Sequence, residues 1–242
     1  LFTNVNILEG TGVLPYRGSV LVEGNRIRQV GRSTSAITPA GATLIDGAGA
    51  TLMPGMVEAH THFSWNDAAT LSGIQTMPLE EHVLWCAKVA KRYLHAGFTS
   101  CLGAACAKPR LDVVIRNAIN NGQIPGPRYL AASQEITVPG GLGDETLPHL
   151  PFPEFSFGVN VNGAEDMRKS VRMFLKYGVD SIKINLSGDN FVPGADSHTA
   201  WMTDAEVAAA VEEVKMRGKR IIVHARSKAS IQQALRHGIE LI

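Results

Sequence analysis

The chain has 242 residues, a mass of 26.0 kDa and a formal net charge of +1. Hydrophobic residues make up 45% and charged residues 19%, a balance that indicates a folded protein with a large interior and excludes a disordered chain. The near-zero charge disfavours nucleic-acid and polybasic membrane binding, and no apolar run approaches the ~20 residues of a membrane span. Three cysteines without a C-x-x-C pair indicate reduced thiols. We expect a cytoplasmic homo-oligomer that binds a small-molecule substrate, with neither nucleic acid nor membrane as a partner.

The first 52 residues differ in pattern from the rest of the chain. Four short β runs, at 4–8, 19–23, 26–30 and 43–45, are separated by glycine-containing turns. This pattern predicts that residues 1–52 are part of a small all-β domain. The boundary with the following part is Met53-Pro54-Gly55.

From residue 56 onward, short apolar runs alternate with amphipathic helical stretches. Several helical stretches end at a glycine, as at Gly97 and Gly178, and Thr203 with Glu206 forms a capping-box pattern. Such an order predicts a parallel sheet with helical crossovers, either a closed (β/α) barrel or an open doubly wound sheet. Six strands are expected to begin near residues 56, 98, 128, 179, 220 and 239, and two long connections are expected at 134–162 and 185–202.

The first strand of this part carries an H-x-H pattern. Strand side chains alternate between faces, so Glu58, His60 and His62 share one face. Two imidazoles two residues apart can reach one metal ion, because neutral imidazole is a good zinc ligand. The alternative is a pair of partly exposed histidines at a strand end.

Two later strands direct polar residues to the same side. Ile182 and Ile184 are expected to face helices, which sends Lys183 inward, and His224 points inward at the carboxyl end of its strand. A buried lysine is costly unless it is paired or neutralised. It either forms an ion pair, with Glu58 as the candidate partner, or loses its charge as a Schiff base or a carbamate.

At these residues the chain resembles the amidohydrolase superfamily, in its two-metal branch with a carboxylated lysine. The motif Pro-Gly-x-x-acid-x-His-x-His, the strand-borne Lys183 and His224 carry the resemblance. The run Lys183-Ile-Asn-Leu-Ser-Gly is similar to that of the Xaa-Pro dipeptidase and basic-residue carboxypeptidase group. The resemblance implies a (β/α)8 TIM-type barrel, with residues 53–242 as its N-terminal part and residues 1–52 as part of a small β-sandwich domain.

The resemblance also implies a mechanism. His60 and His62 would hold one metal, His224 a second, and Lys183, carboxylated by carbon dioxide, would bridge the two divalent ions, with zinc the metal expected. A metal-bridging hydroxide would then cleave an amide-type C–N bond of a peptide, N-acyl, urea or carbamate substrate, with Lys183 and His224 as catalytic residues. The family's strand-six His and strand-eight Asp are not in the sequence, so we expect the chain to be truncated.

Substrate binding is assigned to Trp65, His149 and Arg226, although Arg226 could equally be a surface residue at a helix start. Glu58 departs from the Asp usual in the family. The other functions considered are a one-metal deaminase of the same superfamily, a non-catalytic barrel homologue and a Schiff-base aldolase. Lys183 disfavours the deaminase, and the two histidines of the first strand disfavour the aldolase.

Overall fold

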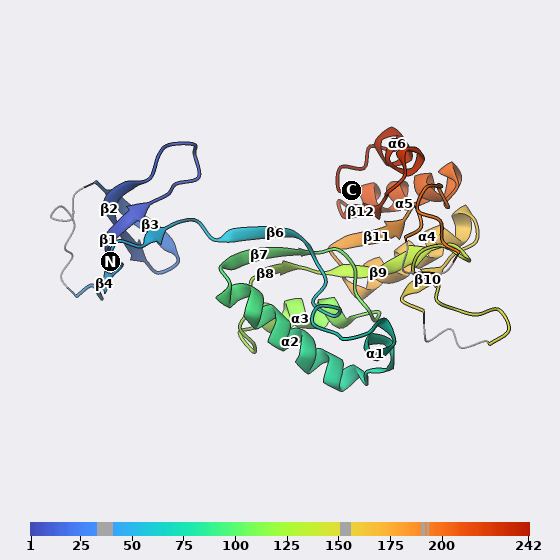
Figure 1. The fold of residues 1–242 in the computed structure, drawn as a ribbon, viewed down its shortest axis with the longest axis horizontal. Coiled ribbons are helices and arrows are strands. Elements are labelled where there is room, and N and C mark those ends of the chain that lie inside the picture. The colour runs from blue at the N-terminus through green and yellow to red at the C-terminus, as the bar shows by residue number, and fades with distance from the viewer. Residues whose placement is uncertain (33–40, 151–155, 190–191, 193) are drawn as a thin grey trace. The chain divides into compact units, whose positions relative to one another are not determined.

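The computed structural model describes residues 1–32, 41–150, 156–189, 192 and 194–242. The chain divides into two compact units, Leu1–Met56 and Val57–Ile242 (Figure 1). Within the described residues, no helix is both long and apolar enough to cross a membrane.

The first unit contains one five-stranded sheet. The strands follow the order β3-β2-β1-β4, and β5 also pairs with β1. Val5, Ile7 and Val20 form its small core. The first three predicted β runs are confirmed, and the fourth, 43–45, overlaps the short strand β4 only at Ile45. Strand β5 was not expected, and the second sheet of a sandwich stays a prediction. The elements are β1 (Phe2–Ile7), β2 (Tyr16–Glu23), β3 (Arg26–Gly31), β4 (Ile45–Asp46) and β5 (Thr51–Leu52).

The second unit alternates strands and helices, as its sequence predicts. Its strands are β6 (Met56–Thr61), β7 (Phe98–Gly103), β8 (Arg128–Leu130), β9 (Ala132–Thr137), β10 (Gly158–Asn160), β11 (Ser181–Asn185) and β12 (Arg220–His224). Its helices are α1 (Leu71–Thr76), α2 (Leu79–His95), α3 (Leu111–Asn120), α4 (Ala164–Tyr177), α5 (Asp204–Met216) and α6 (Lys228–Arg236).

Two sheets meet at Ala131. One has the order β6-β7-β8 and the other β10-β9-β11-β12, and the pairings β7–β8, β9–β10, β9–β11 and β11–β12 are parallel. Only Ala131 separates β8 from β9, and its carbonyl oxygen accepts hydrogen bonds from the backbone N–H groups of Asp180 and Ser181, at 2.8 and 3.2 Å. The result is an α/β fold with parallel sheets; closure into an eight-stranded barrel stays a prediction.

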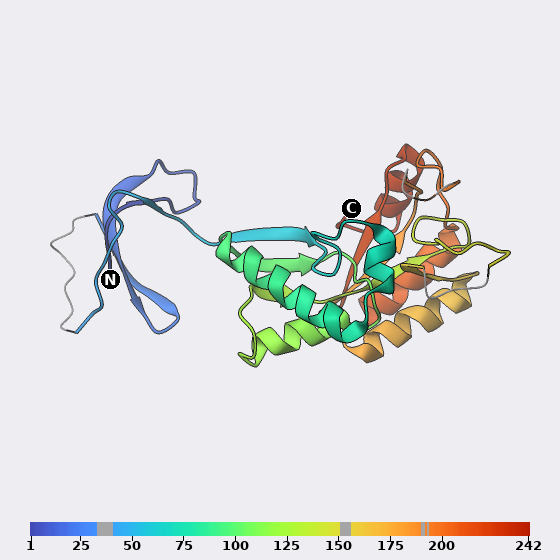
Figure 2. The same ribbon diagram turned by 60° about the horizontal axis from the view of Figure 1, so that its bottom comes forward.

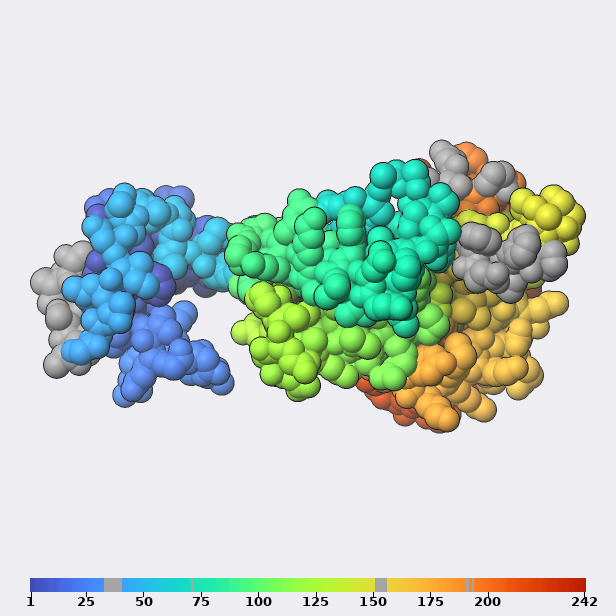
Figure 3. All heavy atoms as spheres, turned by 90° about the horizontal axis from the view of Figure 1, so that it is seen from below, coloured from blue at the N-terminus to red at the C-terminus, as the bar shows by residue number. Residues whose placement is uncertain are grey.

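The helices bury the apolar side of the strands. Ile182 and Ile184 of β11 are fully buried with Phe174 of α4 and Val207 of α5 in the larger core, which confirms that these two isoleucines face the helices. A second core joins α2 and α3 to β7 and β8 and includes the three buried cysteines Cys86, Cys101 and Cys106. In Figure 2, α2, α3, α4 and α5 lie below the strands, whereas α6, in red, lies at the upper right. Residues 79–95, 111–120 and 164–177 make up much of the surface seen in Figure 3.

The expected connection at 134–162 is wrong in part, because it contains most of β9 and all of β10. The strand expected near residue 239 is reduced to a single parallel bridge between Ile222 and Leu241.

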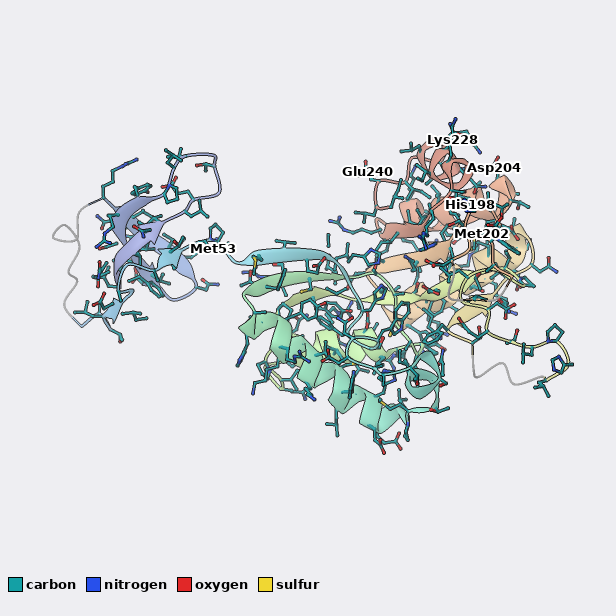
Figure 4. All side chains as sticks on the ribbon, viewed as in Figure 1. Met53, His198, Met202, Asp204, Lys228 and Glu240 are labelled. Atoms are coloured by element: carbon teal, nitrogen blue, oxygen red, sulfur yellow. The ribbon has the colours of Figure 1, made fainter. Side chains whose placement is uncertain are left out.

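Helix ends follow their sequence signals. The capping box of Thr203 and Glu206 is present, and Gly178 ends α4 in the left-handed conformation, φ +92°, which glycine adopts without strain. Asp204, in the first turn of α5, accepts a hydrogen bond from Gln233 of α6 at 3.2 Å. This contact ties α6 to α5 (Figure 4, where Asp204 and Lys228 are labelled).

Glu213 of α5 is a buried acid that joins α5 to α4. Its side chain is 1% exposed and contacts Arg172 and Arg217, both at 2.6 Å, and Arg168 at 3.6 Å. The hydrogen bond from Arg172 is the main reason that the pKa of Glu213 falls to about 2. Because folding lowers this pKa, the stabilisation is complete above the ordinary value of 4.5 and is lost as the pH falls toward 2.

We predict that Glu213→Gln lowers the free energy of unfolding by roughly 2–4 kcal/mol at pH 7, because it leaves three arginines without their shared buried carboxylate. Urea denaturation measures the loss. Glu212→Gln is the matched control, since Glu212 is 55% exposed and Arg168 is its one ion-pair partner among the described residues. Such an exposed pair contributes less than about 1 kcal/mol. Equal losses in the two variants would contradict the assignment.

Candidate active site

Side chains from β6, β9, β11 and β12, together with the loops that follow them, surround a cavity of about 260 Å³. Five of the residues singled out in the sequence line it, namely His60, His62, Trp65, Lys183 and His224. The others are Glu135, Leu142, Glu145, Phe157 and Asp189. His62 follows β6 and His224 ends β12, but Lys183 lies at the centre of β11 and not at its carboxyl end.

His62 is held with one nitrogen free. Its Nδ1 lies 3.2 Å from the carbonyl oxygen of Ala105, which can only accept, so Nδ1 carries the proton and Nε2 keeps a lone pair. Trp65 stacks on the His62 ring with centroids 4.0 Å apart, and the His60 ring lies 5.0 Å away. Burial, with lesser contributions from Lys183 and His60, lowers the pKa of His62 to about 3. Burial also lowers the pKa of His60. Both imidazoles are therefore favoured in the neutral form that binds metals.

Lys183 is almost completely buried, at 2% exposure. Its backbone N–H donates to Ser133 Oγ at 2.9 Å, while its amine forms no ion pair with the described residues. Burial lowers the pKa of this amine, and the charge of Glu135 opposes that shift. The neutral amine is the nucleophilic form of a lysine.

Of the two alternatives for Lys183, the ion pair with Glu58 is not formed in the described part of the chain. Glu58 Oε1 accepts a hydrogen bond from the backbone N–H of His60 at 3.0 Å, and Glu58 lines a separate cavity against Tyr93 and Phe98. The acid on the Lys183 side of the sheet is Glu135.

His224 lies on the far side of Lys183 from β9. Its Nε2 is 3.2 Å from the carbonyl oxygen of Gly188 and 3.6 Å from Asp189 Oδ2, and burial lowers its pKa. Since the carbonyl can only accept, Nδ1 is the nitrogen left with a lone pair. Arg226 pairs with Asp189 at 2.7 Å instead of lining the cavity, and His149 is exposed away from the lining residues.

Three carboxylates of the cavity were missed in the sequence. Burial raises the pKa of Glu135 to about 7 and also raises that of Glu145. Glu145 accepts a hydrogen bond from the Phe157 backbone N–H at 2.8 Å, next to the edge-on contact of Phe157 with Trp65. The third is Asp189. Alternation with the core residue Ile136 is the sequence signal that could have placed Glu135 inward, had β9 been recognised.

The donor set fits a metal centre only if Lys183 is modified. Within the part of the chain that the structure describes, no three His, Cys, Asp or Glu side chains are arranged to hold a metal ion. Three imidazoles favoured in the neutral form surround a buried amine without an ion pair, however, and a carbamate on that amine would add two oxygen ligands. Nitrogen and oxygen ligands of this kind suit zinc and similar divalent ions.

The segment after His62 is anchored to α2. His82 is fully buried, and its Nε2 donates to the Ser64 carbonyl oxygen at 2.7 Å. Ser64 Oγ accepts from the Ala107 backbone N–H at 2.9 Å, and Trp85 Nε1 donates to the Asn66 carbonyl oxygen at 3.0 Å. His82 therefore positions the backbone between His62 and Trp65.

Comparison with known proteins places this cavity in a family context. Residues 51–241 match the sequence profile of the amidohydrolase family. The chain is similar to the ochratoxinase of Aspergillus niger, with 27% identity over 212 residues that cover 77% of this chain and 42% of that protein. It also resembles the structure of a prolidase complexed with N-methylphosphonate-L-proline (26% identity, TM-score 0.87, coverage 99% and 59%). A third similar structure is that of phenylurea hydrolase B, with 25% identity, a TM-score of 0.74 and coverage of 98% of this chain and 57% of that chain. The chain thus spans between two fifths and three fifths of these relatives.

We predict that His82→Phe lowers the free energy of unfolding by about 1–3 kcal/mol, because the buried Ser64 carbonyl oxygen loses its donor while the ring volume is kept. Chemical denaturation monitored by circular dichroism gives the value. His95→Phe, an exposed histidine on the same helix, should change it by less than about 0.5 kcal/mol. If the His82 variant is as stable as the His95 variant, the proposed anchoring is incorrect.

Proposed function

The chain belongs to the amidohydrolase family, and from that premise we propose that it is a metal-dependent hydrolase of an amide-type C–N bond in a peptide, N-acyl, urea or carbamate substrate. The observation that carries the proposal is the buried Lys183 amine in one cavity with His60, His62 and His224. Hydrolases named for amide-type substrates among the similar proteins support the same reaction class.

Each residue has a role in this proposal. His60 and His62 would hold one divalent cation and His224 a second. The neutral amine of Lys183 would add carbon dioxide and release a proton, and the resulting carbamate would supply oxygen ligands to the cations. Burial assists this step because it disfavours the ammonium form, which cannot attack carbon dioxide. The bound cations, zinc by the ligand chemistry, supply hydroxide at neutral pH and polarise the scissile carbonyl.

The remaining walls receive the substrate. Trp65, Leu142 and Phe157 offer an apolar surface beside the histidines, so we propose that an apolar or aromatic group of the substrate packs there. The guanidinium of Arg226 forms an ion pair with Asp189. To bind a substrate carboxylate, Arg226 would have to contact both carboxylates or leave Asp189.

The proposal predicts that Lys183→Ala lowers kcat/KM of the intact protein by at least about 10³-fold and lowers its metal content, because the bridging ligand is lost. Activity is measured against dipeptides, N-acyl amino acids and N-aryl ureas in parallel, with metal content by elemental analysis. A short carboxylic acid added to Lys183→Ala should restore part of the activity by supplying the missing oxygens.

Lys183→Arg serves as the control that keeps a positive charge and cannot form the carbamate. Full activity in Lys183→Arg would exclude the carbamate role. Full activity in wild-type protein stripped of metal would exclude a metal-dependent hydrolase altogether.

A further inference from the structure

Glu135 lies directly beside Lys183 in the sheet. The two residues are register partners on the parallel strands β9 and β11, and both line the cavity. Register partners on neighbouring strands present their side chains on the same face. Glu135 therefore belongs to the same group of side chains as the histidines and the lysine.

The Glu135 carboxylate is buried and only partly hydrogen-bonded. It is 6% exposed, and its Oε2 accepts one hydrogen bond, from Asn185 Nδ2 at 2.9 Å. Among the described residues, no donor contacts its other oxygen, Oε1. A carboxylate has about four acceptor positions, so this group retains capacity for a further ligand.

The surrounding loop leaves room for this carboxylate. A Cβ atom at Gly143 would lie 2.6 Å from Glu135 Oε2, and Gly143 has φ +93°. Asn185 Nδ2 also donates to the Leu142 carbonyl oxygen at 2.8 Å, so one amide group holds both the loop and the carboxylate. The position of Glu135 is thus fixed from two sides.

The negative charges of the cavity favour a bound cation near Glu135. A carbamate on Lys183 is negative, and Glu135, Glu145 and Asp189 line the same cavity, where the guanidinium of Arg226 is paired with Asp189. A buried carboxylate beside another anion destabilises the folded protein unless a cation neutralises it. Lys183 no longer supplies that cation once it is carboxylated.

We propose that Glu135 is a further carboxylate ligand of the divalent cations, in addition to His60, His62, carboxylated Lys183 and His224. This inference rests on the proposed function, since it takes the carbamate and the cations as given. It assigns the free Oε1 to a cation and leaves Oε2 with Asn185, which orients the carboxylate.

The test measures cation binding by the intact protein. Zn²⁺ affinity is determined by competition with a chelator, stoichiometry by elemental analysis, and the ligand field from the visible absorption of the Co²⁺-substituted protein. Glu135→Gln keeps the size of the side chain and its contact with Asn185 but removes the charge. We expect its Zn²⁺ affinity to fall at least about 10-fold, with loss of up to one equivalent and an altered Co²⁺ spectrum.

Glu145→Gln is the matched control, because it neutralises another acid of the same cavity that is bound to a backbone N–H. Its Zn²⁺ affinity should fall by clearly less than that of Glu135→Gln, and its Co²⁺ spectrum should match that of the wild type, because Glu145 is not a ligand in this proposal. Glu135→Asp retains a carboxylate on a shorter side chain, so its Zn²⁺ affinity should lie between those of the wild type and Glu135→Gln. This variant replaces Glu135→Gln in the test if Glu135→Gln does not fold.

Wild-type affinity and spectrum in either folded Glu135 variant would overturn the inference while leaving the proposed function intact. An equal loss of affinity in Glu145→Gln would also overturn it. The loss would then follow from removing any negative charge from the cavity and not from removing a ligand. A wild-type protein that is active and binds no divalent cation would instead contradict the proposed function.

Discussion

The burial of the Lys183 amine governs the chemistry of this chain. An ammonium group removed from water costs several kcal/mol unless it is paired, and no described carboxylate forms an ion pair with this one. Burial therefore lowers the pKa of the amine and favours its neutral, nucleophilic form. Loss of hydration also lowers the pKa values of His62 and His224, and that of His60, which stays more exposed to solvent. One physical cause thus acts both on the amine that we propose is carboxylated and on the imidazoles that we propose as ligands.

The scaffold makes this burial possible by separating two faces of the sheet. Isoleucines 182 and 184 pack into the helical core, so the residue between them must point the other way, whatever its polarity. The helices and strands hold that arrangement through contacts far from the cavity, such as the arginines around Glu213 and the ties between α5 and α6. The contacts that stabilise the fold lie on the helix side of the sheet, and the proposed reactive groups lie on the opposite side.

Alternation along strands explains what the sequence could predict. The inward placement of Lys183 follows from its apolar neighbours, and that of His60, His62 and His224 from the same rule. The rule failed at Glu135, because the β9 sequence Ala-Ser-Gln-Glu-Ile-Thr is mostly polar and its last four residues fall in the predicted connection at 134–162. A strand whose inner face lines a polar cavity does not show the continuous apolar pattern expected of a buried parallel strand.

Other features depend on contacts between residues distant in sequence. The pairing of Arg226 with Asp189 and the contact of His82 with Ser64 involve polar groups whose partners no local pattern identifies. His82 did carry a local signal, since it precedes the buried Cys86 and Val89 by four and seven residues on α2. A stripe that starts one residue later along the chain, at Val83, leaves His82 on the solvent side. A shift of one residue in a helical stripe is enough to misplace such a side chain.

The central claim is that Lys183 carries a carbamate, and carbon-13 NMR of the intact, metal-loaded protein tests it most directly. Protein equilibrated with ¹³C-labelled bicarbonate is compared with Lys183→Met treated in the same way. The account predicts one slowly exchanging carbamate resonance in the wild-type protein and none in Lys183→Met. Fully active, metal-loaded wild-type protein without that resonance would contradict it.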